Sequence, residues 1–205
     1  MDKTALFKIG YGLYVLSAHQ DGFDNGCIVN TVMQAADNPL RLIFSVNKQN
    51  KTHDMIVATG LFAVSCLTED TPFEMFKWYG FQSGKNTNKF VSEAAYTRCE
   101  NGVLRLNTFS NAYMAGKVLS MTDLGSHTLF VAELTEAEVL NNQPSVTYAY
   151  YHAFIKPKPE KNTDGKEKWV CKICGYVHEG PLEADFICPI CKHPASDFEK
   201  MESGA

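Results

Sequence analysis

Short apolar runs broken by turn residues fill the chain from Tyr11 to about Val139. Many short strands with turn signals between them are typical of a sandwich or barrel. The strand candidates cover residues 13–18, 27–34, 40–46, 61–66, 103–109, 112–121 and 128–139. Turns between them are predicted at Asp21-Gly22, Asn25-Gly26 and Asn101-Gly102. The pattern therefore predicts a first domain that is mainly β.

Two short helices are predicted between these strands. The first begins at Thr52 as its N-cap, because a threonine hydroxyl can accept a hydrogen bond from the first helical turn, and it runs to Gly60. The second begins at residue 71 or 72, where Pro72 suits the start of a helix, and it runs to Gly80. Both helices are short crossovers, so the domain keeps its β character.

Beyond Ile155 the composition changes abruptly. Residues 156–168 (KPKPEKNTDGKEK) contain no apolar side chain and carry five lysines against three acidic residues. A segment of this composition buries no core and behaves as a tether. We therefore expect a first domain over 1–155, a mobile linker over 156–168 and a small second domain over 169–205.

Four of the seven cysteines form two CxxC pairs near the end of the chain. Cys171 and Cys174 form the first pair, Cys188 and Cys191 form the second, and 13 residues separate the pairs. The two-residue spacing lets one turn of the chain present both sulfurs to the same metal ion. Four sulfur ligands suit zinc and iron alike, so the spacing leaves both metals open. The other three cysteines lie in strand-like contexts, where a cysteine usually acts as a small buried hydrophobe.

The tail around these cysteines resembles the rubredoxin-type domain that ends rubrerythrins. It reads WxCxxCGYxHEG, then CPxC, then HPxxxFE, between Trp169 and Glu199. The resemblance implies a small metal ribbon in which one iron, held by the four cysteines, carries electrons. His178 and His193 lie near the cluster in the sequence, but four sulfurs already complete a tetrahedron, so neither is expected to bind the metal.

A polar run stands where one strand candidate ends and a helix begins. It covers residues 45–53 (SVNKQNKTH) and combines hydroxyl, amide and cationic side chains. Because the first turn of a helix has unpaired N–H groups, such a run can cradle a phosphate, although most runs of this kind are solvated turns. By contrast, residues 80–86 lack the spacing of a nucleotide-binding P-loop, and residues 10–12 lack the third glycine of a dinucleotide fingerprint.

Several segments of the first domain resemble the flavin reductase-like split barrel that binds FMN. They are GLYVLSAHQDGFDNGCIVNTVMQ, SVNKQNKTHDMI, TGLFAVSCL and TYAYYH, in the family's order, over most of residues 10–153. The resemblance implies a mainly β fold, an FMN-binding split β-barrel with a few helices. It also implies that the tyrosines of residues 147–152 line the flavin or close the barrel, whereas packing in a core or a dimer interface is the simpler expectation.

The same resemblance carries over a set of flavin contacts. Beside the isoalloxazine ring it places Asn30 and Thr31. Beside the ribityl chain and phosphate it places Ser45, Asn47, Lys48, Asn50 and Thr52. Further candidates are His53 and, in the loop FQSGKNTNKF, the residues Ser83, Lys85 and Lys89. An ordinary exposed loop is an equal alternative for the last three.

The overall charge narrows the range of partners. The net charge is −4, and no lysine- or arginine-rich stripe is interleaved with aromatic residues, so nucleic acid is not an expected partner. The longest apolar stretch, 61–67, is too short to span a bilayer, and the first residues lack the apolar region of a signal peptide. We expect a cytoplasmic protein with no membrane partner.

Together the two resemblances imply an electron-transfer protein. The whole chain resembles fused proteins of a flavin reductase and a rubredoxin, which implies transfer from NAD(P)H through FMN to iron and on to a flavodiiron protein that reduces oxygen or nitric oxide. The family also implies a homodimer. The alternatives are a flavoredoxin-like carrier that never reacts with NAD(P)H, and an FMN-binding module with a structural zinc ribbon. The sequence leaves open the choices of NADH or NADPH and of FMN or FAD.

Overall fold

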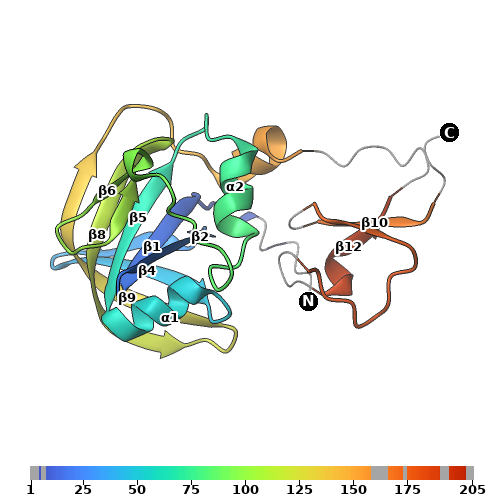
Figure 1. The fold of residues 1–205 in the computed structure, drawn as a ribbon, viewed down its shortest axis with the longest axis horizontal. Coiled ribbons are helices and arrows are strands. Elements are labelled where there is room, and N and C mark those ends of the chain that lie inside the picture. The colour runs from blue at the N-terminus through green and yellow to red at the C-terminus, as the bar shows by residue number, and fades with distance from the viewer. Residues whose placement is uncertain (1–4, 6–7, 158–165, 173–174, 190–193, 202–205) are drawn as a thin grey trace. The chain divides into compact units, whose positions relative to one another are not determined.

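The chain forms two compact units, Met1–Ala153 and Phe154–Ala205. The computed structural model describes residues 5, 8–157, 166–172, 175–189 and 194–201. Figure 1 shows the first unit as a curved sheet with helices and the second as a small group of strands. Most of the predicted linker, 156–168, lies outside the described residues.

A seven-stranded antiparallel sheet forms the body of the first unit (Figure 1). Its strands lie in the order β2-β1-β5-β8-β9-β4-β3, so that β2 and β3 are its edges. Their bounds are Tyr14–Gln20 (β1), Phe23–Val29 (β2), Val32–Asp37 (β3), Leu40–Asn47 (β4), Leu61–Leu67 (β5), Ser110–Asp123 (β8) and His127–Val139 (β9). A small ribbon of β6 (Tyr96–Arg98) and β7 (Leu104–Leu106) accompanies the sheet. This architecture confirms the mainly β fold, with the turn at Asn101-Gly102 between β6 and β7.

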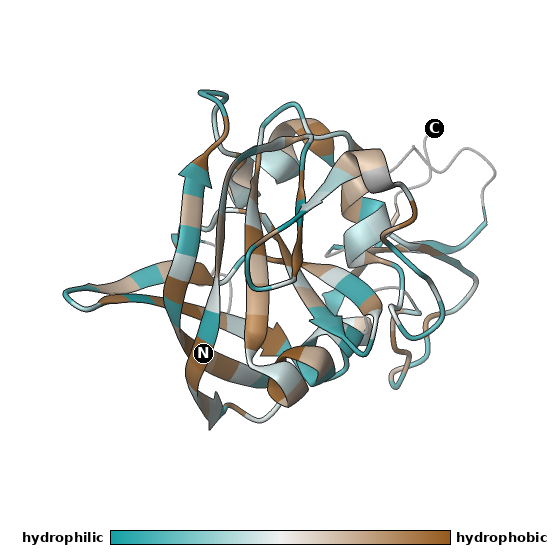
Figure 2. Cartoon of the chain, turned by 60° about the vertical axis from the view of Figure 1, so that its left-hand side comes forward, coloured by the Kyte–Doolittle hydropathy of each residue, from teal (hydrophilic) through white to brown (hydrophobic). Residues whose placement is uncertain are grey.

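Alternating burial along the strands creates the core. In β4, Leu42, Phe44 and Val46 are buried while the residues between them are half-buried. Figure 2 shows hydrophobic and hydrophilic positions alternating along strands of the sheet. The ring of Phe44 lies 4.7 Å from the ring of Phe62 and 5.1 Å from the ring of Phe130, measured between centroids. Three fully buried aromatic side chains contribute several kcal/mol of hydrophobic stabilisation, on the order of 2 kcal/mol each. They hold together β4, β5 and β9, whose order along the chain is not their order in the sheet.

The predicted turn at Asn25-Gly26 is wrong, because both residues lie inside β2. The hairpin between β1 and β2 turns instead at Asp21 and Gly22, whose φ angles are 50° and 79°. A two-residue turn needs this left-handed backbone at both positions. Gly26 serves a different purpose, since a Cβ atom there would lie 3.2 Å from the ring of Phe90. Of the two turns predicted here, the one at Asp21-Gly22 is confirmed and the one at Asn25-Gly26 is not.

Helix α1 (Lys51–Thr59) follows β4 and has its N-cap two residues before the predicted one. Its N-cap is Asn50, not Thr52, and the Asn50 side chain makes no capping hydrogen bond. Thr52 lies within the first turn and is 1% exposed. Its hydroxyl is turned toward the sheet instead of capping the helix, which makes it a candidate for the site below.

Two further helical segments pack on each other. Helix α2 (Phe73–Gly80) begins after Pro72, close to the prediction. The TYAYYH stretch forms the short helix α3 (Tyr148–Tyr150) and a π-helical turn (Tyr151–Ile155), which the sequence pattern did not predict. Tyr151 is buried, with its ring centroid 4.6 Å from that of Phe76 on α2. The stretch therefore packs in the core of the first unit. Within the described part of the chain, no helix is long and apolar enough to cross a lipid bilayer.

Gly116 of β8 allows the two longest strands to lie against each other. A Cβ atom at this position would lie 2.0 Å from the carbonyl oxygen of Glu133 on β9. We expect Gly116→Ala to lower the free energy of unfolding of the first unit by about 2–3 kcal/mol, because backbone pairing must shift to admit one methyl group. Urea denaturation measures this. Gly10→Ala is the matched control, since a Cβ there meets nothing within 4 Å; equal effects of both variants would contradict the prediction.

The second unit is built around a three-stranded sheet. Its order is β11-β10-β12, with bounds Val177–Glu179 (β11), Lys168–Cys171 (β10) and Phe198–Lys200 (β12). Val170, Cys171, Cys188 and Phe198 are its buried apolar residues among those described. The ring of Phe186 lies 5.5 Å from that of Phe198. So few buried side chains cannot stabilise a domain of this size unaided.

Candidate functional site

The loop between β2 and β3 is fastened to the middle of β4. The Thr31 hydroxyl donates a hydrogen bond to the Ser45 carbonyl oxygen at 2.8 Å and accepts one from the Ser45 amide at 3.2 Å. Asn30, just before Thr31, is half-buried at the end of β2. Three of the residues predicted to contact a flavin ring and ribityl chain are thus held at one place, although 14 residues separate Thr31 from Ser45.

The turn from β4 into α1 is built by Asn47. Its side-chain oxygen accepts a hydrogen bond from the Gln49 amide at 2.9 Å, and its carbonyl oxygen accepts one from the Asn50 amide at 3.0 Å. Lys48 points away from this turn, because its ammonium pairs with Asp123 at 2.6 Å. The ammonium hydrogen bond holds the pKa of the Asp123 carboxyl below its usual range. Lys48, one of the predicted phosphate ligands, is therefore paired with Asp123 in this structure.

The start of α1 presents an open first turn over β2. The Asn50 side chain makes no capping hydrogen bond, and the His53 amide donates to the Asn50 carbonyl oxygen at 3.1 Å, so the amides of the first turn before His53 are those that an anion can approach. The Thr52 hydroxyl accepts a hydrogen bond from the Asn25 amide at 3.3 Å. The helix start and β2 are thereby joined through polar side chains.

Asn25 is a site residue that sequence reasoning missed. It is 1% exposed, and its side-chain oxygen has no hydrogen-bond partner in the described structure. Its amide lies against Gly84, where a Cβ atom would come within 2.1 Å of the amide nitrogen. The only sequence signal was an asparagine before a glycine, which predicts a turn. A buried amide oxygen without a partner is satisfied by a donor, such as a water molecule or a ligand hydroxyl, so its position between two polar segments fits a site that a polar ligand completes.

The loop after α2 reaches the same place from another part of the chain. Gly84 touches Asn25, and the Ser83 hydroxyl accepts a hydrogen bond from the Lys85 amide at 3.3 Å. The Lys85 side chain is exposed. Lys89 is directed inward, because its ammonium donates to the carbonyl oxygens of Gly26 and Tyr79. The structure thus brings the helix start, β2 and this loop together, with Lys85 at the surface and Lys89 beneath it.

His53 faces the sheet and not the helix start. Its Nε2 lies 2.9 Å from the Thr128 hydroxyl on β9, and its Nδ1 lies 3.1 Å from Asp54. Its ring also packs edge-on against Phe130 at 5.9 Å. The side chain has both nitrogens engaged within the fold, so it anchors α1 to the sheet.

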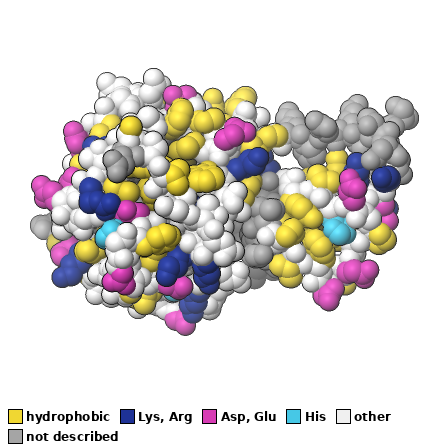
Figure 3. All heavy atoms as spheres, viewed as in Figure 1, with side chains coloured by type: hydrophobic (Ala, Val, Ile, Leu, Met, Phe, Trp, Pro, Cys, Tyr) yellow, Lys and Arg dark blue, Asp and Glu magenta, His cyan; other side chains and the backbone are white. Residues whose placement is uncertain are grey.

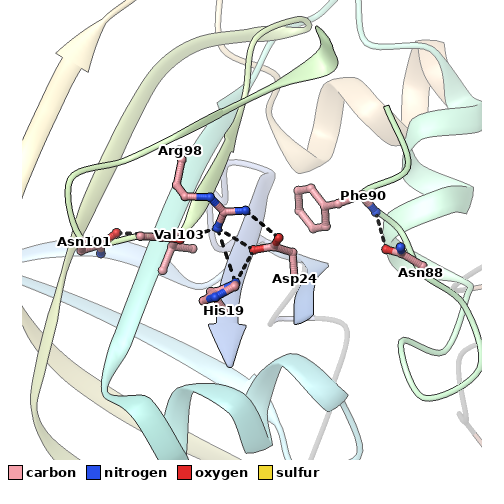
Figure 4. A network of polar contacts seen from close by, with 8 residues as sticks. His19, Asp24, Asn88, Phe90, Arg98, Asn101 and Val103 are labelled. Atoms are coloured by element: carbon pink, nitrogen blue, oxygen red, sulfur yellow. Dashed lines mark hydrogen bonds and ion pairs between the residues drawn. The ribbon is translucent and has the colours of Figure 1, made fainter. Parts of the chain in front are cut away.

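A separate cleft lies between β2 and the ribbon of β6 and β7. Its volume is about 570 Å³, and it is lined by Asp24, Asn88, Phe90, Val91, Tyr96, Arg98 and Leu104. Figure 4 shows the Arg98 guanidinium reaching from β6 to Asp24 and His19. The hydrogen bond to Asp24 raises the pKa of Arg98. The charges of this cleft pair with each other, and none of the predicted flavin contacts lines it.

Charge on the surface of the first unit is mixed. On the face shown in Figure 3, described Lys and Arg side chains alternate with Asp and Glu side chains and with hydrophobic patches. No continuous basic stripe crosses this face among the described residues.

Two cysteines of the first unit are poorly placed for redox chemistry, because burial raises the pKa of the Cys66 and Cys99 thiols to about 11. They remain thiols at neutral pH.

In the second unit, two of the four predicted metal ligands can be placed. Cys171 ends β10 and Cys188 follows the β-bridge at Ile187, and both are 0% exposed. Cys174 and Cys191 lie outside the described residues. Gly175, with φ 80°, donates its amide to the Cys171 carbonyl oxygen at 2.8 Å. This closed turn after the first cysteine, together with the buried sulfurs, suits a thiolate metal site.

Comparisons with known proteins identify both units. Residues 6–156 match the model of the flavin reductase like domain, and residues 169–199 match that of the rubrerythrin, rubredoxin-like domain. The chain is 32% identical to the high molecular weight rubredoxin of Moorella thermoacetica, over 98% of this chain and 100% of that protein. It is 37% identical to the ferric-chelate reductase (NAD(P)H) of Archaeoglobus fulgidus, over 77% of this chain and 93% of that protein.

The fold of the first unit also recurs in solved structures. BorF, the flavin reductase component of a bacterial two-component tryptophan halogenase, superposes with a TM-score of 0.64. The similarity covers 71% of this chain and 90% of that chain at 18% sequence identity. At this identity the likeness establishes the shared fold.

Proposed function

Since this chain belongs to the flavin reductase-like family and ends in a rubredoxin-like domain, as high molecular weight rubredoxin does, we propose that it passes electrons from NAD(P)H through FMN to one iron. Its class is an electron-transfer oxidoreductase. In the proposed reaction a flavin accepts two electrons as a hydride and releases them singly, and a one-iron centre accepts them one at a time. The protein therefore needs no nucleophile or general base, and no residue is assigned a catalytic role.

One observation carries the flavin assignment. The open first turn of α1, the buried Asn25 of β2 and the loop at Gly84 meet at one place, although they are far apart in the sequence. Peptide N–H groups and amide donors at a helix start favour a phosphate. In this proposal Asn50, Thr52 and Lys85 hold the phosphate end of FMN.

The ring end of the proposed flavin site lies at the opposite end of β2. There Asn30 and Thr31 face the isoalloxazine ring, and Ser45 and Asn47 lie beside the ribityl chain. The double hydrogen bond between Thr31 and Ser45 supports this assignment, because it fixes the loop that would carry the ring contacts. A fixed loop limits the entropy lost when a ligand binds.

The second unit supplies the proposed iron site. Cys171, Cys174, Cys188 and Cys191 would hold the metal as thiolates. The buried Cys171 and Cys188 sulfurs support this, as does the match to the rubredoxin-like domain. Zinc remains the competing metal, since it accepts the same four ligands.

We further propose a homodimer and a flavodiiron protein as the electron acceptor. Exposed hydrophobic residues support self-association of the first unit: Met33 on the edge strand β3 is 59% exposed, and Met121 on β8 is 45% exposed. The acceptor is proposed from the resemblance to fused flavin reductase and rubredoxin proteins. An acidic second domain would favour an acceptor with a basic docking patch.

A visible spectrum of the purified protein tests the proposed function. We expect the absorption of flavin and of an iron tetrathiolate together, and we expect both to bleach when NADH or NADPH is added without oxygen. Metal analysis should find one iron per chain. A spectrum that bleaches with dithionite but with neither nicotinamide would favour the carrier that does not react with NAD(P)H. Protein without flavin, or with zinc in place of iron, would overturn the proposal.

A further inference from the structure

Lys89 is a buried cation in the first unit. It is 2% exposed, and its ammonium donates hydrogen bonds to the carbonyl oxygens of Gly26 and Tyr79, each at 2.9 Å. Its own carbonyl oxygen accepts hydrogen bonds from the Trp78 indole at 2.9 Å and from the Tyr96 hydroxyl at 3.3 Å. Side chain and backbone together fasten this end of the 81–90 loop to β2, α2 and β6.

The charge of Lys89 has no partner of opposite sign in the described structure. Burial lowers the pKa of its ammonium, while the two carbonyl acceptors favour the protonated form. Tyr79 lies in the last turn of α2, where the helix dipole also favours a cation. No carboxylate among the described residues forms an ion pair with this ammonium. A buried cation without a counter-ion is costly, so an anion nearby would be favoured.

The Lys89 ammonium binds β2 next to the residue that contacts the start of α1. Gly26, whose carbonyl oxygen accepts from Lys89, follows Asn25 in β2, and the Asn25 side-chain amide donates to the Thr52 hydroxyl at 3.3 Å. The loop held by Lys89 carries Gly84, which covers the buried amide of Asn25. The cation and the loop that it fastens therefore belong to the same cluster as the proposed phosphate cradle.

We propose that Lys89 is a positioning and specificity residue, which holds the 83–88 loop against β2 and supplies a buried positive charge that selects phosphorylated flavin over riboflavin. This inference rests on the proposed flavin site. FMN and riboflavin share the ring and the ribityl chain and differ in the phosphate alone, so their affinity ratio isolates the effect of charge. Because movement of the loop would also displace Lys85 from the phosphate, the effect of the charge is read from a variant that keeps the loop in place.

The test compares Lys89→Met with the wild-type full chain after its flavin has been removed. Titration of FMN and of riboflavin, followed by quenching of flavin fluorescence, gives the two dissociation constants. We expect Lys89→Met to weaken FMN about tenfold and riboflavin less than about twofold, because a charge within several ångströms acts on the phosphate alone. Lys77→Met removes an exposed lysine of α2 and should leave both affinities unchanged.

Lys89→Gln is a second variant that keeps the test valid if Lys89→Met does not fold. A glutamine amide can still donate to both carbonyl oxygens but carries no charge. We expect Lys89→Gln to lower the FMN-to-riboflavin affinity ratio as Lys89→Met does. An unchanged ratio in Lys89→Gln would overturn the inference and leave Lys89 a structural anchor. Equal affinity of the wild-type protein for both flavins would also overturn the inference about Lys89, while the proposed flavin site would stand. Binding of neither flavin would overturn the proposed function itself.

Discussion

Replacement of Cys171 by serine is expected to abolish the iron absorption of the protein and to unfold its second unit. The Cys171 side chain is 0% exposed and ends the central strand β10. A serine hydroxyl does not replace a thiolate ligand, and a domain this small depends on its metal for folding energy. The loss should therefore be complete and not graded. The flavin absorption of the first unit should persist, because none of its proposed contacts lies in the second unit.

Metal analysis, the visible spectrum and tryptophan fluorescence measure this result. Trp169 lies on β10 beside Val170 and reports on the second unit, whereas the other tryptophan, Trp78, lies on α2. Cys66→Ser is the matched control, since Cys66 lies on β5 of the first unit and should leave the iron in place. A Cys171→Ser protein that keeps one iron per chain with an unchanged iron absorption would show that this cysteine is not a ligand.

Gly84→Ala is expected to weaken FMN binding by about tenfold to thirtyfold, equivalent to roughly 1.4–2 kcal/mol. A Cβ atom at Gly84 would lie 2.1 Å from the nitrogen and 2.4 Å from the oxygen of the Asn25 amide. Because Asn25 is buried and hydrogen-bonded to Thr52, the 83–88 loop must move away from β2. That movement displaces Lys85 from the helix start, where we propose that the phosphate binds.

Fluorescence titration of FMN measures the Gly84→Ala effect, and two variants sharpen it. Gly80→Ala is the matched control, because a Cβ there makes only ordinary contact with Ile28 at 3.4 Å. Asn25→Ala combined with Gly84→Ala should return the loop to β2 and recover part of the affinity, so that the two changes are not additive. Unaltered FMN affinity in Gly84→Ala would separate this loop from the flavin site.

Much of the fold followed from local patterns. The strand candidates at 40–46, 61–66 and 128–139 became β4, β5 and β9 with ends shifted by one residue. Alternating burial and bounding turn residues mark such strands wherever they pair. Local signals failed where two readings competed, as at Asn25-Gly26, whose turn-forming residues lie in an edge strand. The short helix at Tyr148–Tyr150 carried no periodic signal, because its position depends on contacts with α2.

The candidate site likewise combines residues that the sequence indicated with residues that only the structure revealed. Resemblance pointed to the segments that carry Thr31, Ser45 and Thr52, and the structure places these segments beside each other. The resemblance gave no indication of Asn25. Lys48 and Lys89 were both expected near the phosphate, yet one pairs with Asp123 and the other is buried against Gly26 and Tyr79.

The amino-acid sequence by itself determined the mainly β character of the first unit and the two CxxC pairs of the second, because the alternation of strands and the spacing of cysteines are properties of neighbouring residues. Only the tertiary structure decided where each polar side chain points. Lys89 bonds to Gly26 across 63 residues of chain, and Thr52 bonds to Asn25 across 27. Such partners are chosen by the pairing of distant strands, and the burial that shifts a pKa or excludes water arises only once those strands have met.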